Sequence, residues 1–224
     1  MWRPRCVTLR GESRQGVGHR LLRWVEYLFL GLGVLALGVC ALLYFQARLY
    51  QARERRQFGG NKPPMAIASL RPRPMPVRLS VRNGSPLSRL DIPRLGISVV
   101  VVEGVTARDL RLGLGHIPGT AFPDEFGNVG IAGHRDTFLR QLRKIHPHDL
   151  ITLTTLAGSY QYSVDWTRIV RPRDVAVLDP VEEPILTIVT CYPFYWVGSA
   201  PERFIVRAKQ TDRPVLDEIA TEEK

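Results

Sequence analysis

An uninterrupted apolar run, Tyr27 to Phe45, is the feature that most constrains this chain. Its nineteen residues, YLFLGLGVLALGVCALLYF, include no charged side chain. With a rise of about 1.5 Å per residue, a helix of this length crosses most of the hydrocarbon core of a bilayer. A helix that is apolar on every side is rare in the core of a soluble domain of this size, so the run predicts one membrane span.

A cleaved signal peptide is the closest alternative for this run. The apolar region of such peptides is usually about 7 to 15 residues long, and no convincing small-residue cleavage site follows Phe45. An uncleaved signal anchor at residues 27–46 is therefore favoured. Arginines stand on both sides of it, so counting positive charges leaves its orientation open.

The basic charge of the chain belongs to its N-terminal part. The formal net charge is +10 over 224 residues. Up to Leu79 there are 14 Lys and Arg against 3 Asp and Glu, which gives +11, whereas Ser80–Lys224 has 17 against 18, which gives −1. A basic surface on the folded part is therefore not expected, and the composition indicates no nucleic-acid partner.

Residues 47–87 have the Arg-, Pro- and Gly-rich composition of a semi-extended linker, into which the helix could continue as far as Arg56. From Ser88 onward, short β-branched runs alternate with turn residues, which predicts strands. Two helical pieces are expected among them, TARDLRLG and DTFLRQLRKI, the second capped by Asp136 or Thr137. These patterns predict a small all-β domain at residues 88–212, before an acidic tail at 213–224.

Cys191 ends the apolar segment EPILTIVTC and needs an explanation. Cys40 lies inside the predicted span and Cys6 precedes it, so neither can pair with Cys191 in the same chain if the span is real. A free cysteine can be an inert buried residue, and Cys191 taken alone is as consistent with that alternative as with a reactive thiol. It can also be a nucleophile, which needs a proton carrier nearby.

Two residues elsewhere in the chain offer the chemistry that a thiol nucleophile needs. His134 ends the apolar segment NVGIAGH, and Arg203 begins the segment RFIVRA. The loop after Cys191 would bring Arg203 back beside the cysteine. An imidazole there can transfer a proton, and a guanidinium can offer directed donors to an oxyanion. Taken singly, such residues are more often a structural histidine and a surface charge.

Three separated stretches together resemble one enzyme family. TIVTC, ending at Cys191, resembles the Thr-Leu-x-Thr-Cys signature of the sortases, with Ile188 where Leu is usual. GHIPGTAFPDEFGNVGIAGHRDTF resembles the stretch around the sortase histidine. CYPFYWVGSAPERFIVRAK resembles the cysteine-to-arginine segment of class D sortases, and the likeness runs almost continuously from Leu90 to Lys209.

The resemblance implies a closed eight-stranded sortase-type β-barrel with two short helices, preceded by one N-terminal transmembrane helix. It also implies an orientation. Residues 1–26 would be a cytoplasmic basic segment, 27–46 a signal anchor in the bacterial plasma membrane, and 88–212 an extracytoplasmic catalytic barrel.

The activity implied by the resemblance is transpeptidation of surface proteins. Cys191 would attack the threonine–glycine bond of an LPxTG-like sorting signal, His134 would protonate the departing amine, and Arg203 would hold the oxyanion. An amine acceptor, such as a peptidoglycan precursor, would then take the acyl group. The residues expected to bind the peptide are Thr190, Tyr192, Phe194 and Trp196, although the aromatic ones could instead cover the end of the barrel.

No cofactor and no metal are expected. His146 and His148 with Cys191 lack the paired spacing of zinc ligands, and Asp124 with Glu125 fits no calcium loop. Asp136 is expected to cap a helix rather than to orient His134. His116 is expected to be structural.

Two functions from other classes stay open. A membrane-tethered cysteine peptidase would use the same three residues with water as its acceptor, and a product assay with and without an added amine separates it from a transpeptidase. A non-catalytic anchored binding barrel would need no thiol, so retention of function by Cys191→Ser would favour it.

Overall fold

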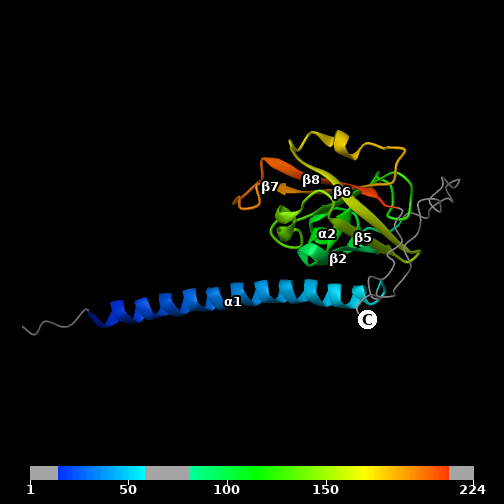
Figure 1. The fold of residues 1–224 in the computed structure, drawn as a ribbon. Helices are drawn as coiled ribbons and strands as arrows, with labels where there is room; N and C mark the ends of the chain where they lie inside the picture. The colour runs from blue at the N-terminus through cyan, green and yellow to red at the C-terminus, as the bar shows by residue number, and fades with distance from the viewer. Residues whose placement is uncertain (1–14, 59–80, 212–224) are drawn as a thin grey trace, which may run out of the picture. The chain divides into compact units, whose positions relative to one another are not determined.

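The computed structural model describes residues 15–58 and 81–211 (Figure 1). The chain divides into two compact units, one up to Phe45 and one from Gln46 onward. Parts of the predicted N-terminal segment (1–14), of the linker (59–80) and of the acidic tail (213–224) lie outside the described residues.

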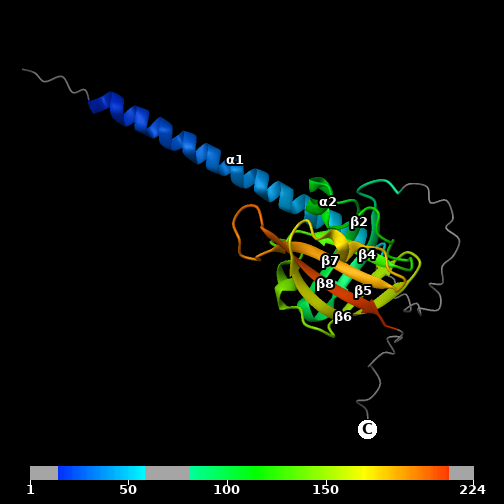
Figure 2. The ribbon, with the colours of Figure 1, turned by 90° about the horizontal axis from the view of Figure 1, so that it is seen from above.

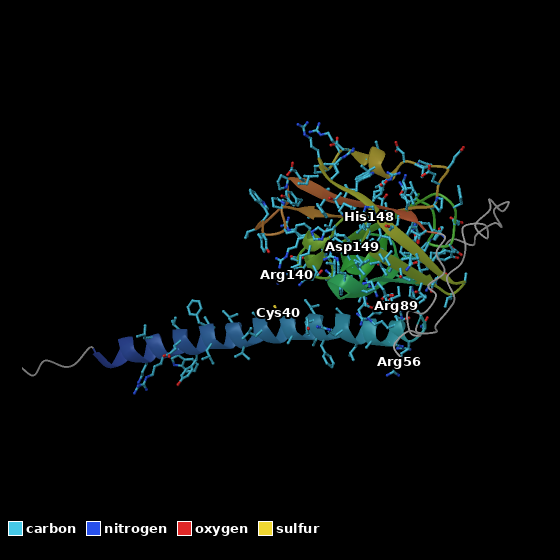
Figure 3. All side chains as sticks on the ribbon, viewed as in Figure 1. Cys40, Arg56, Arg89, Arg140, His148 and Asp149 are labelled. Atoms are coloured by element: carbon cyan, nitrogen blue, oxygen red, sulfur yellow. The ribbon has the colours of Figure 1, made fainter. Side chains whose placement is uncertain are left out.

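The long N-terminal helix, α1 (Gln15–Arg55), contains the predicted span. Its stretch Leu22–Arg55 is long and apolar enough to cross a membrane. The apolar side chains from Leu28 to Phe45 are exposed, and so is Cys40 (Figure 3). Length and composition alone fit either a membrane anchor or a signal sequence.

Eight strands close into a barrel, as predicted (Figure 2). In chain order they are β1 (Pro86–Ile92), β2 (Ile97–Glu103), β3 (Leu114–His116), β4 (Asn128–Gly133), β5 (Leu150–Thr155), β6 (Ser159–Val170), β7 (Ile185–Tyr192) and β8 (Glu202–Gln210). Their order around the barrel is β1-β2-β3-β4-β7-β8-β6-β5, with β5 closing on β1. The pairs β2–β3 and β4–β7 are parallel and the others are antiparallel.

The barrel interior is filled by aliphatic side chains and two tyrosines. Alternate residues of each strand point inward, because successive side chains of a strand face opposite sides. Members of this core include Leu90, Ile92, Val99, Val101, Leu114, Val129, Ile131, Ile151, Leu153, Tyr160, Tyr162, Leu186, Ile188, Val206 and Ala208. Their close packing gives a rigid frame for the strand ends.

The connections contain one short α-helix and three 3₁₀ turns. The helix α2 (Ala107–Leu112) begins at Thr106, whose hydroxyl accepts a hydrogen bond from the Asp109 amide in a capping box. The 3₁₀ turns are η2 (Pro93–Leu95), η3 (Arg140–Lys144) and η4 (Val175–Leu178).

The helix predicted in DTFLRQLRKI is a short 3₁₀ helix, and the predicted cap by Asp136 or Thr137 is wrong. The segment forms η3, and no side chain caps its start at Leu139. Its buried residues Leu139, Leu142 and Ile145 recur every third position, which suits the three residues per turn of a 3₁₀ helix. Asp136 is exposed and precedes the turn.

The end of α1, within the second unit, covers the outer face of β2. Phe58 is buried there with Val100 and Val102, and Tyr50 packs against them. The Gln51 side chain accepts a hydrogen bond from the Val100 amide at 2.9 Å and donates one to the Leu112 carbonyl at 2.6 Å. These contacts explain why β2 contains four consecutive valines, Val99 to Val102, since both faces of the strand are buried there.

Candidate active site

Three neighbouring strands place the three predicted catalytic residues at one end of the barrel. Cys191 in β7 pairs directly with Arg203 in β8, a position at which Cβ atoms lie roughly 4.5–5.5 Å apart. On the other side, Thr190 pairs with Gly133, the last residue of the parallel strand β4. His134 follows Gly133, so the register brings it beside Cys191. The thiol therefore stands between an imidazole and a guanidinium.

A cavity of about 300 Å³ opens at this point. Its lining residues are His134, Arg135, Asp136, Cys191, Gly198, Ser199, Ala200 and Arg203. Cys191, His134 and Arg203 are all half-buried, and Cys191 is a free thiol. A thiol at a cavity wall is accessible to a ligand, which the inert buried alternative would not allow.

The three side chains keep their reactive atoms available. Within the described part of the chain, neither the His134 ring nor the Cys191 thiol has a hydrogen-bond or ion-pair partner. Arg203 donates from Nη1 to the carbonyls of Ala200, at 3.2 Å, and Glu202, at 2.9 Å. These bonds fix the guanidinium plane while Nε and Nη2 remain for a ligand.

Small residues and a buried hydroxyl fix the position of His134. A Cβ on Gly133 would lie 2.5 Å from Leu114 Cδ2 and 2.8 Å from Leu139 Cδ1, so any side chain there would have to displace these two buried leucine side chains. Thr190 is buried, and its Oγ1 donates to the Gly133 carbonyl at 2.8 Å. This bond ties β4 to β7 immediately before His134 and Cys191.

The loop between β7 and β8 carries the predicted aromatic residues. Tyr192 and Phe194 are half-buried and form a ring cluster with Phe204, with centroids 5.3 to 6.4 Å apart. Phe194 and Phe204 also pack against the barrel core. Trp196 is 51% exposed at the loop tip. None of these four, nor Thr190, lines the cavity.

Arg135 is a cavity residue that the sequence did not single out. Its Nη2 donates to the carbonyls of Trp196, at 2.7 Å, and Gly198, at 3.0 Å. The only sequence signal is its place beside His134 in GHRD. Asp136 also lines the cavity, with its side chain exposed.

Other polar groups serve the fold. The buried His116 ring lies 2.7 Å from Glu103 through Nδ1 and 2.9 Å from the Ala121 carbonyl through Nε2. The Asp149 carboxylate accepts two hydrogen bonds from Arg94, and these lower the pKa of Asp149 below its usual value. Within residues 15–58 and 81–211, no group of three His, Cys, Asp or Glu side chains is placed to hold a metal ion.

Comparison with known proteins gives a consistent result. The sortase domain family matches residues 90–211. Sortase D of Bacillus subtilis is 36% identical over 122 residues, 54% of this chain and 62% of that protein. The chain spans between 42% and 62% of the length of the curated relatives it matches.

Solved structures show the same barrel. A Clostridium perfringens sortase D5 transpeptidase aligns with a TM-score of 0.54 and 34% identity, over 59% of this chain and 82% of that one. Sortase E1 from Streptomyces coelicolor, solved with a tripeptide in its active site, aligns with a TM-score of 0.53 and 30% identity, over 58% and 91%.

Proposed function

The chain belongs to the sortase family, and from that premise we propose that it is a membrane-anchored cysteine transpeptidase that joins surface proteins to the cell envelope. The observation that carries this proposal is the register of β4, β7 and β8, which puts Cys191 between His134 and Arg203 at one cavity. Each residue then has a role that its chemistry suits.

The first half of the reaction breaks a peptide bond and forms a thioester. The Cys191 thiolate attacks the carbonyl carbon of the threonine–glycine bond in an LPxTG-like sorting signal. The charge that develops on the carbonyl oxygen is stabilised by the free donors of Arg203. His134, as imidazolium, gives its proton to the leaving amine, so the carbon–nitrogen bond breaks and the glycine end departs.

The second half transfers the acyl group to an amine. The acceptor nitrogen, such as that of a peptidoglycan precursor, attacks the thioester, and neutral His134 takes the proton that it loses. The new amide forms and the thiolate is restored. A cysteine peptidase would differ only here, with water as the acceptor, and nothing about the three side chains favours that alternative.

The aromatic loop supplies the peptide-binding wall in this proposal. The bound peptide would extend beyond the cavity over the β7–β8 loop, where Trp196 is exposed and Tyr192 and Phe194 are half-buried. Thr190 would act through its main chain, since its hydroxyl already donates to Gly133.

The location proposed for the enzyme follows from α1. Residues 27–46, which lie within the long apolar stretch Leu22–Arg55, are taken as a single-pass anchor in the bacterial plasma membrane, with the barrel on the extracytoplasmic side. The exposed apolar side chains of α1 suit a membrane span, because lipid would cover them. Treatment of intact cells with a protease, followed by detection of the barrel, tests this orientation.

A product assay tests the activity. The full chain is incubated with an LPxTG-type peptide, with and without an added amine, and the products are identified by mass spectrometry. We expect a thioester on Cys191 and, with the amine, an acyl-amine product at the expense of the free acid. The free acid alone at saturating amine would favour the peptidase, and no turnover would contradict both.

A further inference from the structure

The two terminal nitrogens of Arg135 have different environments at the cavity wall. Its Nη2 holds the β7–β8 loop through the carbonyls of Trp196 and Gly198. Its Nη1 is shielded from solvent and has no hydrogen-bond partner within the described residues. The other described buried side-chain atoms without a partner belong to Glu54, Ser88 and Gln210, none of which lines the cavity.

A buried cationic donor without a partner is costly, so such an atom needs an explanation. Arg135 and Arg203 both line the cavity, and neither has an ion-pair partner in the described part of the chain. Asp136 is the cavity carboxylate, and it forms no ion pair with either. Two guanidinium groups with free donors suit a ligand rich in carbonyl oxygens, which is what a bound peptide main chain presents.

The two arginines also hold different parts of the β7–β8 loop. Arg135 holds its middle, at Trp196 and Gly198, and Arg203 holds its end, at Ala200 and Glu202. The loop tip exposes the side chains of Tyr195, Trp196 and Val197. One side chain on the far wall of the cavity therefore fixes the loop beside Cys191.

We propose that Arg135 positions the acyl-donor peptide: its Nη2 holds the β7–β8 loop beside Cys191, and its Nη1 donates a hydrogen bond to a main-chain carbonyl of that peptide. The carbonyl is not the one attacked, because Arg203 is the arginine paired directly with Cys191. The loop-holding part stands on the geometry of this chain alone. The peptide part rests on the proposed function.

A substrate-free experiment tests the loop. The full chain, its Arg135→Ala variant and an Arg140→Ala control are digested briefly with chymotrypsin, and cleavage after Tyr195 or Trp196 is followed by mass spectrometry. Arg140 is a matched control because it is exposed and does not line the cavity (Figure 3). We expect cleavage about 10-fold faster in Arg135→Ala alone, since one side chain provides both loop bonds. Equal rates in all three proteins would overturn the proposal.

Steady-state kinetics on an LPxTG-type peptide test the donor. We expect Arg135→Ala to lose about 10- to 100-fold in kcat/KM, mainly through KM, because a charged hydrogen bond to bound peptide is removed. Alkylation of Cys191 by iodoacetamide, which needs no peptide, should change by less than about 3-fold. Arg135→Lys should return loop cleavage towards the parental rate but keep the high KM of Arg135→Ala. A single ammonium cannot bond the loop and the peptide at the same time, as the two terminal nitrogens of a guanidinium can.

Peptides in which single amides are replaced by alkenes identify the contact. Replacing the amide whose carbonyl accepts from Arg135 should lower the kcat/KM of the parent about 10-fold. The same replacement should hardly change the kcat/KM of Arg135→Ala, as expected for a direct partner. Equal losses in both proteins at every position would overturn the donor role. A parent that turns over no peptide would contradict the proposed function and the donor role with it. Turnover that Arg135→Ala leaves unchanged would contradict only the inference.

Discussion

Two histidines in the same barrel, His116 in β3 and His134 after β4, have opposite environments. His116 is 1% exposed, bonded through both ring nitrogens and stacked on Phe122 with ring centroids 4.8 Å apart. His134 is half-buried at the cavity, and its ring has no partner within the described residues.

The difference shows where chemistry is possible in this fold. A carbonyl only accepts hydrogen bonds, so the Ala121 oxygen requires a proton on His116 Nε2, and Glu103 occupies the other nitrogen. No ring atom of His116 remains for a substrate. His134 keeps both nitrogens for a reaction. Reactivity therefore follows unused hydrogen-bonding capacity at a cavity wall, not residue type.

The largest effect is expected from removing the reacting groups. Cys191→Ala and His134→Ala should each lower the rate of thioester formation by at least about 1,000-fold, because the nucleophile or the proton donor is lost. Thermal unfolding should stay within about 2 °C of the parent, since neither side chain has a hydrogen-bond or ion-pair partner to lose among residues 15–58 and 81–211. Loss of the folded state in Cys191→Ala would mean that the thiol is a core residue.

Arg203→Lys asks whether the cavity needs directed donors or only a positive charge. Removing an oxyanion donor typically lowers the rate about 100- to 1,000-fold, and the lysine ammonium cannot reproduce the guanidinium plane that Ala200 and Glu202 orient. We expect a loss in that range in single-turnover kinetics, with Arg203→Ala as the reference. A folded lysine variant with more than about a third of the parental rate would contradict the directed-donor role.

His116→Ala should lower stability and leave the rate nearly unchanged, the opposite of what we expect for His134→Ala. It leaves the Glu103 carboxylate buried without its partner, which we expect to lower the free energy of unfolding by about 3 kcal/mol. The kcat/KM of the protein that remains folded should change by less than about 3-fold. Glu103→Gln, which keeps the shape of the partner, should cost less. A large rate loss without destabilisation would place His116 in the reaction and break the comparison.

Asp149→Asn should have the smallest effect, and one that depends on pH. The hydrogen bonds from Arg94 lower the pKa of Asp149 in the folded state, so its stabilisation is present above the usual pKa of about 3.9 and is lost as the pH falls through the lowered value. At pH 7 the variant should be less stable by about 1 kcal/mol. The difference in Tm between the two proteins should shrink below about pH 4, and a constant difference would exclude this linkage.

Much of the barrel could be predicted from local patterns. The strands β1, β2 and β4 to β8 are short runs bounded by turn residues, most of them rich in β-branched side chains, and the long helix follows from an apolar run that is rare in a soluble core. Strand β3 has three residues, Leu114–His116, too few to show any period, so its place was not predicted and only the eight strands implied by the family resemblance allowed for it. The 3₁₀ form of Arg140–Lys144 depends on how Leu139 and Leu142 reach the core, which a helical period does not reveal.

The three residues proposed as catalytic were accessible to sequence reasoning because three motifs carry them, whereas Arg135 was not. Its role depends on carbonyls 61 and 63 residues away, and main-chain carbonyls leave no trace in side-chain identity. The residues that cover the outer face of β2 were also not predictable from the sequence. Val100 and Val102 look like core residues in the sequence, but only the folded chain shows that Tyr50 and Phe58 cover them.

The contact between Gln51 and β2 means that the end of α1, the proposed anchor, also shields part of the barrel. Strand β2 pairs with β3 only from Val101 onward, so the Val100 amide is bonded by a side chain that belongs to the anchoring helix. Proteolytic shedding by a cut between Phe58 and Ser80 would sever the chain between this cover and the barrel. A shed barrel that lost the cover would expose two valines beside an unpaired strand amide, which is a template for another β-strand. If α1 is the membrane anchor proposed above, such a cut would thus produce a self-associating species rather than a free enzyme.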